Sequence, residues 1–237
     1  MPTAELTRKT ALLANMKEIS SRIESACLRG GRDADAVKLL IVTKYAKDED
    51  VILLAAAGAL KTAGESRVQD ARARWTGSGP LAGLRAGVEL HLIGHLQTNK
   101  ARAAAEIFDW VDSVDSLRIA SELSRHAEAL GKKLPVLIQL KLNPSPTQSG
   151  VSPDEAPALL AEVRKLPGVE PRGYMGIAPE GASPAELEAV FRGARAVFDR
   201  DFSGPGNYLS LGMSGDFEAA VAAGSNLPRL GSLVFGQ

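Results

Sequence analysis

The stretch LLIVTKYAK, residues 39–47, begins like a buried β-strand and then runs into positive charge. Its first five residues are apolar or β-branched, which is typical of a strand buried on both faces. Because side chains alternate along a strand, Leu40, Val42 and Lys44 should share one face. Lys44 therefore stands where the strand should leave its sheet, at the C-terminal end.

The same kind of run recurs along the rest of the chain, and alanine-rich segments typical of helices separate the first seven runs. The further runs are ALKTAGES (59–66), VELHLIG (88–94), WVDSVD (110–115), PVLIQLKLN (135–143), VEPRGYMGIA (169–178), YLSLGMS (208–214) and LPRLGSLVFG (227–236). Eight βα repeats in 237 residues predict an α/β protein with a single (β/α)₈ TIM barrel. An open doubly wound sheet is the alternative, but no Gly-rich nucleotide fingerprint follows the first strand.

An extra amphipathic helix, at about residues 3–28, precedes the first strand and is closed by Gly30 and Gly31. The sequence stops at Gln237, directly after the eighth strand. We therefore expect the last helix of the barrel to be missing and the N-terminal helix to cover the gap. A serine is the predicted N-cap of three later helices: Ser116, Ser152 and Ser183.

No stretch looks like a domain boundary, so we expect residues 1–237 to form one domain. The stretches TGSGPLAG (76–83) and NPSPTQSG (143–150) are short enough to be loops. A single cysteine, Cys27, excludes an internal disulfide and a multi-thiolate metal cluster. The first twenty residues lack the apolar core of a signal peptide, and no apolar run approaches membrane-spanning length, so we expect a cytoplasmic protein.

The charges balance, with 28 basic and 28 acidic residues. A net charge of zero gives no electrostatic footprint for nucleic acid or for an anionic membrane, so we expect neither as a partner. A small phosphate ligand is still possible, because it needs only a local site. We expect the chain to act as a monomer.

The last predicted strand carries an arginine beside residues suited to an anion. Alternation places Leu227, Arg229 and Gly231 on one face, and Arg229 needs an acceptor because an unpaired buried charge is costly. Gly231 and Ser232 offer backbone N–H groups to a phosphate. Ser214 stands just before a predicted helix whose N-terminus has free N–H donors. Phosphate sites in TIM barrels commonly follow strands seven and eight.

Taken one at a time, these residues have ordinary explanations. On position alone, Lys44 is better explained as a strand-end lysine reaching solvent, while Ser214 is equally explained as a simple N-cap and Gly231 as a tight contact. Together they specify a ligand that combines a phosphate, a ring beside Arg229 and an aldehyde within reach of Lys44. Pyridoxal 5′-phosphate (PLP) has all three groups, and a lysine amine forms a Schiff base with its aldehyde.

Five motifs also resemble the YggS/PROSC family, the pyridoxal phosphate homeostasis proteins. They are IVTK (41–44), GESRVQD (64–70), HLIGHLQTNK (91–100), LSLGMSGDFEAAVAAG (209–224) and PRLGSLVFG (228–236). The match runs in order from about residue 38 to residue 236. It implies a barrel similar to the N-terminal domain of alanine racemase, which binds PLP as a lysine aldimine and acts in intracellular vitamin B6 homeostasis.

The resemblance also assigns roles at the site. Lys44 would form the aldimine, Ser214 and the backbone of residues 231–232 would hold the phosphate, and Arg229 would lie near the pyridine nitrogen. An arginine there keeps that nitrogen unprotonated, so the cofactor is a weak electron sink. The cofactor-binding residues expected in this way are Lys44, Ser66, Met213, Ser214, Arg229, Gly231 and Ser232. Two departures stand out: Ser66 replaces a usual asparagine, and Gln148 replaces a lysine found in many members.

Two kinds of function fit such a site. One is a carrier without catalytic turnover that holds PLP and passes it to PLP-dependent apoenzymes, and this is the function we expect. The alternative is an enzyme, either a fold-type III amino-acid racemase or a class I aldolase. Racemisation needs acid/base groups on both faces of the ring, and Lys44 serves only one. Of the three tyrosines, Tyr45 should point away from Lys44 and Tyr208 should lie at the far end, so only Tyr174 could approach the mouth.

Four other charged or titratable residues have less specific interpretations. His91 and His95 lie around the end of the third strand but lack a third ligand, so we do not expect a metal site, and His95 should line the pocket. Glu65 and Arg67 flank Ser66 and are expected to form an ion pair at the rim, which is worth little by itself.

Overall fold

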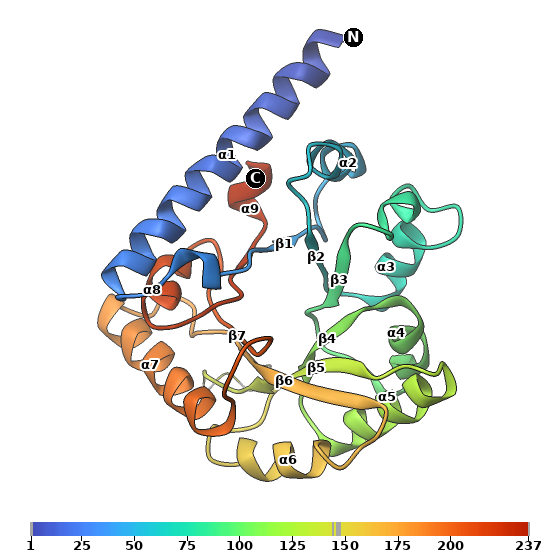
Figure 1. Cartoon of the computed structure of the whole chain (residues 1–237), viewed down its shortest axis with the longest axis vertical. Coiled ribbons are helices and arrows are strands. Elements are labelled where there is room, and N and C mark those ends of the chain that lie inside the picture. The colour runs from blue at the N-terminus through green and yellow to red at the C-terminus, as the bar shows by residue number, and fades with distance from the viewer. Residues whose placement is uncertain (1, 144, 146–147, 237) are drawn as a thin grey trace.

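Eight parallel strands curl into a barrel with helices around it (Figure 1). The computed structural model describes residues 2–143, 145 and 148–236, and within them the predicted (β/α)₈ barrel is confirmed. The strands are β1 (Leu40–Val42), β2 (Thr62–Glu65), β3 (Glu89–Leu92), β4 (Trp110–Val114), β5 (Leu134–Leu140), β6 (Val169–Gly176), β7 (Tyr208–Ser210) and β8 (Arg229–Leu230). Each falls within or overlaps one of the eight predicted runs.

The helices alternate with these strands. They are α1 (Pro2–Arg29), α2 (Asp48–Ala56), α3 (Val68–Trp75), α4 (Ala101–Ile107), α5 (Leu117–Ala129), α6 (Ala156–Val163), α7 (Pro184–Asp201), α8 (Phe217–Ala222) and α9 (Ser232–Phe235). Short 3₁₀ turns lie at Ala34–Ala36, Ala82–Leu84 and Thr98–Lys100. No helix in the described part of the chain is both long enough and apolar enough to cross a membrane.

The barrel is closed at one seam by individual hydrogen bonds. The strand order is β7-β6-β5-β4-β3-β2-β1-β8, so β7 and β8 are the two edges of the sheet. Across the seam, the Arg229 amide donates to the Gly212 carbonyl at 3.0 Å. The Ser210 hydroxyl donates to the Leu227 carbonyl at 2.9 Å. These bonds bring the C-terminal ends of β7 and β8 together.

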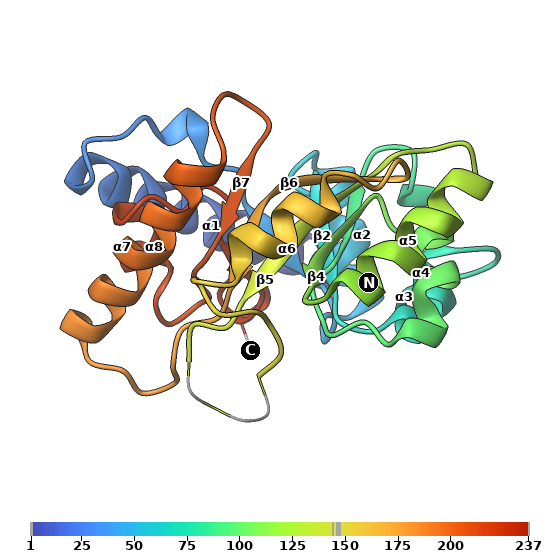
Figure 2. The same cartoon turned by 90° about the horizontal axis from the view of Figure 1, so that it is seen from below.

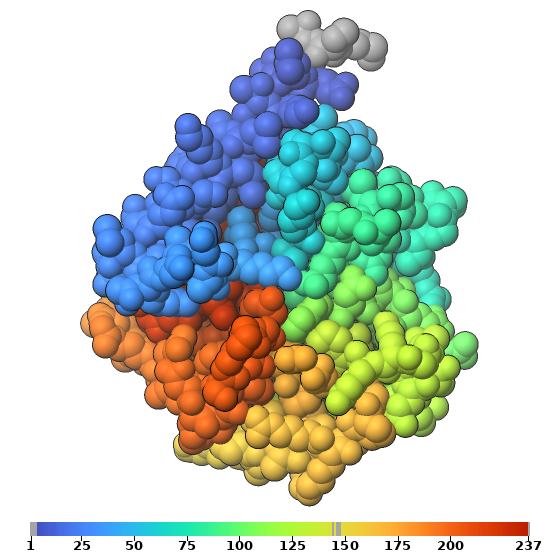
Figure 3. Space-filling view, in the orientation of Figure 1, coloured from blue at the N-terminus to red at the C-terminus, as the bar shows by residue number. Residues whose placement is uncertain are grey.

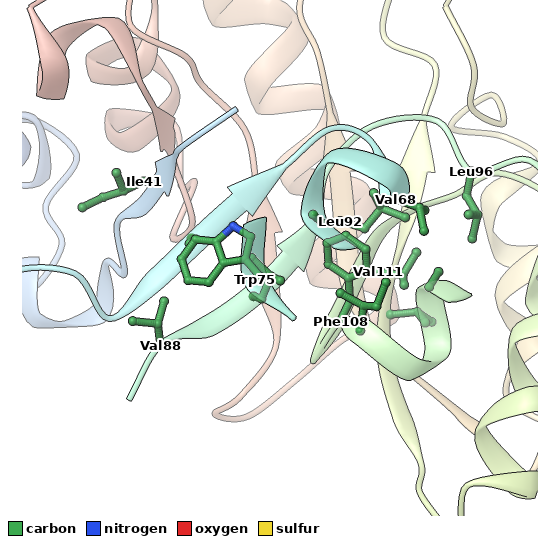
Figure 4. Close-up of a cluster of buried hydrophobic side chains, with 14 of the residues drawn as sticks. Ile41, Val68, Trp75, Val88, Leu92, Leu96, Phe108 and Val111 are labelled. Atoms are coloured by element: carbon green, nitrogen blue, oxygen red, sulfur yellow. The ribbon is translucent and has the colours of Figure 1, made fainter. Parts of the chain in front are cut away.

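Alternation along the strands separates the inside of the barrel from its outer layer. Leu40 of β1 faces inward, where it packs with Leu137 and Leu227. Its neighbour Ile41 belongs to the larger cluster between strands and helices, which Figure 4 shows around Trp75 and its neighbours. Each fully buried side chain of this size contributes roughly 1.5–3 kcal/mol by leaving water, so the outer layer supplies most of the stabilisation.

Helix α1 lies across the end of the chain, where the blue and red segments meet in Figures 1 and 3. Arg8 donates to both carboxylate oxygens of Asp50 and to the carbonyl of Phe235. Asn15 donates to the Val234 carbonyl at 3.0 Å. The expectation of a missing last helix is wrong, because the one-turn helix α9 follows β8 and ends at Gly236, whose φ of 69° suits glycine. The expectation that the N-terminal helix covers this side of the barrel is confirmed.

The predicted N-caps have different outcomes. Ser183 forms a full capping box at the start of α7, and Ser116 caps α5, so both predictions are confirmed. The prediction for Ser152 is wrong in its detail. Helix α6 begins only at Ala156, and the Ser152 hydroxyl accepts from the Glu155 amide in the turn that precedes the helix.

Seen from below, α7 and α8 lie on one side of the barrel and α3, α4 and α5 on the other (Figure 2). Within the predicted loop at residues 143–150, the described residues 143, 145 and 148–150 belong to no helix or strand. Pro144, Pro146 and Thr147 lie outside the described residues. Gln148 is described, and its side-chain amide donates to the Ile177 carbonyl at 3.0 Å.

Candidate functional site

A pocket of about 350 Å³ opens at the C-terminal ends of β1 and β8. It contains six of the seven cofactor-binding residues predicted from the sequence, and Ser66 is the exception. The residues that line it are Val42, Lys44, Tyr45, Ile93, Met213, Ser214, Gly215, Arg229, Gly231 and Ser232. The barrel therefore gathers side chains from opposite ends of the sequence into one space.

Lys44 stands on a turn rather than on the strand itself. β1 ends at Val42, and the Ala46 amide donates to the Thr43 carbonyl at 3.0 Å, which closes the turn. The Lys44 ammonium lies 4.9 Å from the centroid of the Tyr45 ring. The prediction that Tyr45 points away from Lys44 is therefore wrong, because strand alternation no longer applies once the chain has turned.

Arg229 is buried at the base of this pocket, with 4% of its surface exposed. Its Nη1 donates to the Ser210 carbonyl at 2.7 Å and to the Ser210 hydroxyl at 2.9 Å, and its Nη2 donates to the Gly176 carbonyl at 2.9 Å. The acceptors that the sequence required are thus neutral oxygens on β6 and β7. Its Nε makes no hydrogen bond with the described part of the chain, so the Nε–H and one of the two Nη2–H donors are unused.

Burial lowers the pKa of Arg229 to about 10, while the charges of Asp112 and Asp216 oppose that shift. The guanidinium is therefore still a cation at neutral pH. A cation whose forked donors are partly engaged by carbonyls is held in one orientation.

Two segments that line this pocket carry backbone N–H groups with no acceptor among the described residues. The amides of Ser214 and Gly215 donate no hydrogen bond within the described residues. The prediction that Ser214 directly precedes a helix is wrong by two residues, because α8 has Asp216 as its N-cap. The Asp216 carboxylate accepts from the Met213 amide at 2.6 Å and so shapes the turn that exposes those two amides.

The second segment is the start of α9. Its first donors to helical carbonyls are the amides of Val234 and Phe235, so the amides of Ser232 and Leu233 precede them and are available to a ligand. Gly231 lets this segment approach β1 closely. A Cβ atom at Gly231 would lie 3.0 Å from the Val42 carbonyl oxygen, which is closer than ordinary contact.

Ser66, the seventh predicted residue, is half-buried and does not line this pocket. Its carbonyl oxygen lies so close to Gly94 that a Cβ atom there would come within 2.1 Å of it. The loops after β2 and β3 therefore meet backbone to backbone at Ser66.

A larger cleft, of about 1160 Å³, adjoins the pocket and shares Ile93, Met213 and Gly215 with it. His95 lines this cleft and not the smaller pocket. Its Nδ1 lies 3.2 Å from the Asp115 carboxylate and 3.0 Å from the Ser149 hydroxyl.

His91 is fully buried inside the barrel, between two carboxylates. Its Nδ1 lies 3.0 Å from both Asp112 oxygens and its Nε2 lies 3.0 Å from Glu89 Oε1. Its ring stacks on Trp110 at 5.3 Å. Burial alone would lower the pKa of His91, but the neighbouring Asp112 and Glu89 carboxylates raise it to about 9. His91 is therefore an imidazolium at neutral pH.

Sequence reasoning missed this interior cluster, because it weighed His91 only as a metal ligand. Alternation was the available signal, since it places Glu89 and His91 on the same face of β3. Burial would raise the pKa of Glu89, but hydrogen bonds from His91 and Lys38 lower it to about 2.

Glu65 is also fully buried, and its partner differs from the predicted one. It pairs with Arg74 of α3 at 2.7 Å, so the predicted rim ion pair with Arg67 is wrong. The reason is orientation: Glu65 follows Ala63 on the outer face of β2 and points toward α3, away from the rim. Burial raises the pKa of Glu65.

The tyrosines lie away from the pocket, except Tyr45. Tyr174 donates to the Asp201 carboxylate at 2.6 Å and packs edge-on against Phe202, behind β6. The prediction that it could approach the mouth is therefore wrong, because it lies on the outer face of its strand. Tyr208 begins β7 and contacts Trp110 edge-on inside the barrel, so its predicted place at the far end is confirmed.

A parallel barrel with a lysine after its first strand and a buried arginine on its last defines a class of protein, the barrel domain of alanine racemases. The family described as alanine racemase, N-terminal domain, matches residues 10–237. Within this class, the chain belongs to the family of pyridoxal phosphate homeostasis proteins, as its motifs predicted. It is 35% identical over 227 residues to the pyridoxal phosphate homeostasis protein of Pseudomonas aeruginosa, with 96% of each chain covered.

Solved structures agree with this assignment. PipY of Synechococcus elongatus, whose structure was determined with PLP bound, is 36% identical, with a TM-score of 0.74 over 92% of this chain and all of PipY. A protein of unknown function from Bifidobacterium adolescentis is 29% identical, with a TM-score of 0.85 over 97% of this chain and 96% of that one.

Proposed function

We propose that this chain binds PLP in the pocket between β1 and β8 and acts in the homeostasis of that cofactor. One observation carries the proposal: Lys44, Arg229 and unused backbone donors of two segments line the same 350 Å³ space. The names of the relatives and the PLP-bound structure of PipY support it. The simplest form of the proposal is a single-domain monomer that passes the cofactor to apoenzymes in the cytoplasm.

The residues of the pocket suit the three parts of this cofactor. The amides of Ser214, Gly215 and Ser232 can bind the phosphate, and Gly231 lets the segment that carries Ser232 lie close to β1. The unused Nε–H of Arg229 can donate to the ring nitrogen. When bound, the cofactor supplies an aldehyde that condenses with an amine, and Lys44 has the amine that lines this pocket.

The properties of Arg229 favour a protein that holds PLP over one that uses it to convert amino acids. A guanidinium with a pKa of about 10 does not give up its proton at neutral pH, so it donates to the ring nitrogen without protonating it. Of the three tyrosines, Tyr45 lines the pocket but stands on the same turn as Lys44, and the other two lie outside the pocket. Tyr174 is engaged with Asp201 behind β6, and Tyr208 lies at the other end of the barrel. We infer that the protein holds its cofactor without significant catalysis.

Borohydride reduction of the cofactor-loaded protein, followed by mass spectrometry of its peptides, tests the proposal. The reduced adduct is expected on Lys44. Lys47→Ala is the matched control, since Lys47 is an exposed lysine three residues away that does not line the pocket. An adduct on Lys47 or Lys141, or no adduct on any lysine, would refute the assignment.

A further inference from the structure

We propose that Arg74 is a positioning residue for Lys44, because its guanidinium holds the turn that presents the Lys44 amine to the pocket. This inference rests on the proposed function, which gives Lys44 its covalent role. Arg74 is not among the residues that line the pocket. It stands on α3, the helix behind β2, and acts through the backbone of residues 43–46.

The backbone of this turn is closed at one point within the described part of the chain. A single backbone bond, from the Ala46 amide to the Thr43 carbonyl, closes it. The N-cap of the following helix is Lys47, whose side chain makes no capping bond. Lys44 and Tyr45, between the two ends of the turn, are both exposed. A turn of this kind needs an outside contact if the lysine is to keep one position.

Arg74 supplies that contact at both ends of the turn. Its Nη1 donates to the Thr43 carbonyl at 2.8 Å and its Nη2 donates to the Ala46 carbonyl at 3.1 Å. Its Nε donates to the Asp48 carboxylate at 2.8 Å, at the first residue of α2. One guanidinium thus bridges the residues on either side of Lys44 and Tyr45.

Glu65 fixes Arg74 in turn. Its Oε1 accepts from Arg74 Nη1 at 2.7 Å, from the Trp75 indole at 3.0 Å and from the Thr43 hydroxyl at 2.8 Å. Its Oε2 is buried without a hydrogen-bond partner in the described structure. Three donors on one carboxylate oxygen therefore connect α3, β2 and the lysine turn, and the planar fork of arginine is needed to reach both carbonyls.

A second arginine offers a matched control at the other end of the barrel. Arg85 also grips a carboxylate and two carbonyls, those of Asp109, Val88 and Ile107. Its side chain is 26% exposed, against 16% for Arg74. Its loss should cost the fold a similar amount, but it touches no part of the lysine turn.

The first experiment uses the cofactor-free protein and measures hydrogen exchange of the peptide that contains residues 43–47. Arg74→Ala is expected to speed exchange of the Ala46 amide by about tenfold or more, because the turn loses both carbonyl contacts. Arg85→Ala should leave that peptide unchanged. Arg74→Lys keeps the charge but not the fork, and should fall between Arg74→Ala and the wild type.

The second experiment measures PLP affinity from the absorption of the bound cofactor, together with thermal unfolding. Arg74→Ala should weaken affinity by about 10- to 100-fold, and Arg85→Ala by less than about twofold, at comparable losses of melting temperature. Equal affinities in the two variants, or unchanged exchange of the turn in Arg74→Ala and Arg74→Lys, would overturn the positioning role. If the wild type forms no adduct on Lys44, the proposed function fails. Faster exchange in Arg74→Ala would then show only that Arg74 stabilises this turn in the fold, and the positioning role would be refuted.

Discussion

Arg229 Nη1 lies 2.7 Å from the carbonyl oxygen of Ser210, across the seam where β8 meets β7. The same guanidinium reaches the Gly176 carbonyl on β6. One side chain therefore helps to close the barrel while it stands at the base of the pocket. These two roles can be measured separately. Barrel closure affects the stability of the cofactor-free protein, whereas cofactor binding is measured as an affinity.

Arg229→Ala should therefore act on both properties. Charge-assisted hydrogen bonds contribute roughly 1.5–3 kcal/mol each, so PLP affinity should fall by about one to two orders of magnitude. The melting temperature of the cofactor-free protein should also fall, because two buried carbonyls lose their donors. Cofactor titration and thermal unfolding on the same sample separate the effects. Unchanged affinity would remove Arg229 from the binding site.

Lys44→Ala should abolish the yellow absorption of the bound cofactor and leave the barrel folded. The side chain is exposed, and the Tyr45 ring that it contacts is exposed too, so its loss should change the melting temperature of the cofactor-free protein little. Absorption spectra and far-UV circular dichroism check both parts. A persistent yellow band would show that another amine carries the cofactor.

His91 should make stability depend on pH. Its folded pKa of about 9 lies above the ordinary value of 6.5, so its contribution is fully present below pH 6.5 and is lost as the pH rises through 9. The melting temperature should thus fall by several degrees between pH 7 and pH 9.5. His91→Gln should flatten this dependence, because glutamine does not titrate in this range. An unaltered slope in His91→Gln would assign the effect to other groups.

Two glycine-to-alanine substitutions test different properties: Gly231→Ala should lower the affinity for PLP, and Gly193→Ala should raise the stability of the fold. Gly231→Ala places a Cβ atom 3.0 Å from the Val42 carbonyl oxygen, so β8 must shift, and PLP affinity should fall by about tenfold. Gly193 is an exposed residue of α7 with no atom within 4 Å of an added Cβ. Gly193→Ala should raise the free energy of unfolding by about 0.5–1 kcal/mol, as expected for alanine in a helix. Urea unfolding and cofactor titration of both variants test the pair.

The PLP-loaded protein should show little turnover of amino acids. Racemisation needs a proton donor on the face of the ring opposite Lys44, and Tyr174 is held by Asp201 on the outside of β6. The test is to follow the optical rotation of L- or D-alanine and serine. Turnover well above that of free PLP, lost in Lys44→Ala, would contradict a carrier and draw attention to His95 in the neighbouring cleft.

The sequence predicted what depends on regular backbone geometry. Period-two alternation predicts that Leu40 and Val42 share one face and that Ile41 points the other way, and the structure confirms this. The same rule and the barrel fold brought Lys44 and Arg229 to one rim, although 185 positions separate them in the chain, the difference between 229 and 44. Repeating strands therefore carry most of the information about the fold and the general location of the site.

What the sequence did not predict lies where regular structure ends. Tyr45 turned toward Lys44 because β1 stops at Val42, and nothing local marks that end. Glu65 pairs with Arg74, nine positions away, and not with the nearby Arg67, because its partner depends on the direction in which the end of the strand points its side chain. These outcomes are set by tertiary contacts, which a single sequence does not display.

The hydrogen bonds between α1 and α9 also determine the order in which the parts of the phosphate cradle come together. Arg8 and Phe235, which it joins, are 227 positions apart. α9 begins with Ser232, whose amide belongs to the predicted phosphate cradle. The cradle therefore cannot be completed until two segments far apart in the sequence, α1 and α9, have met during folding. Such distant contacts slow folding, so a newly made chain should acquire its barrel strands before it acquires the ability to retain a ligand.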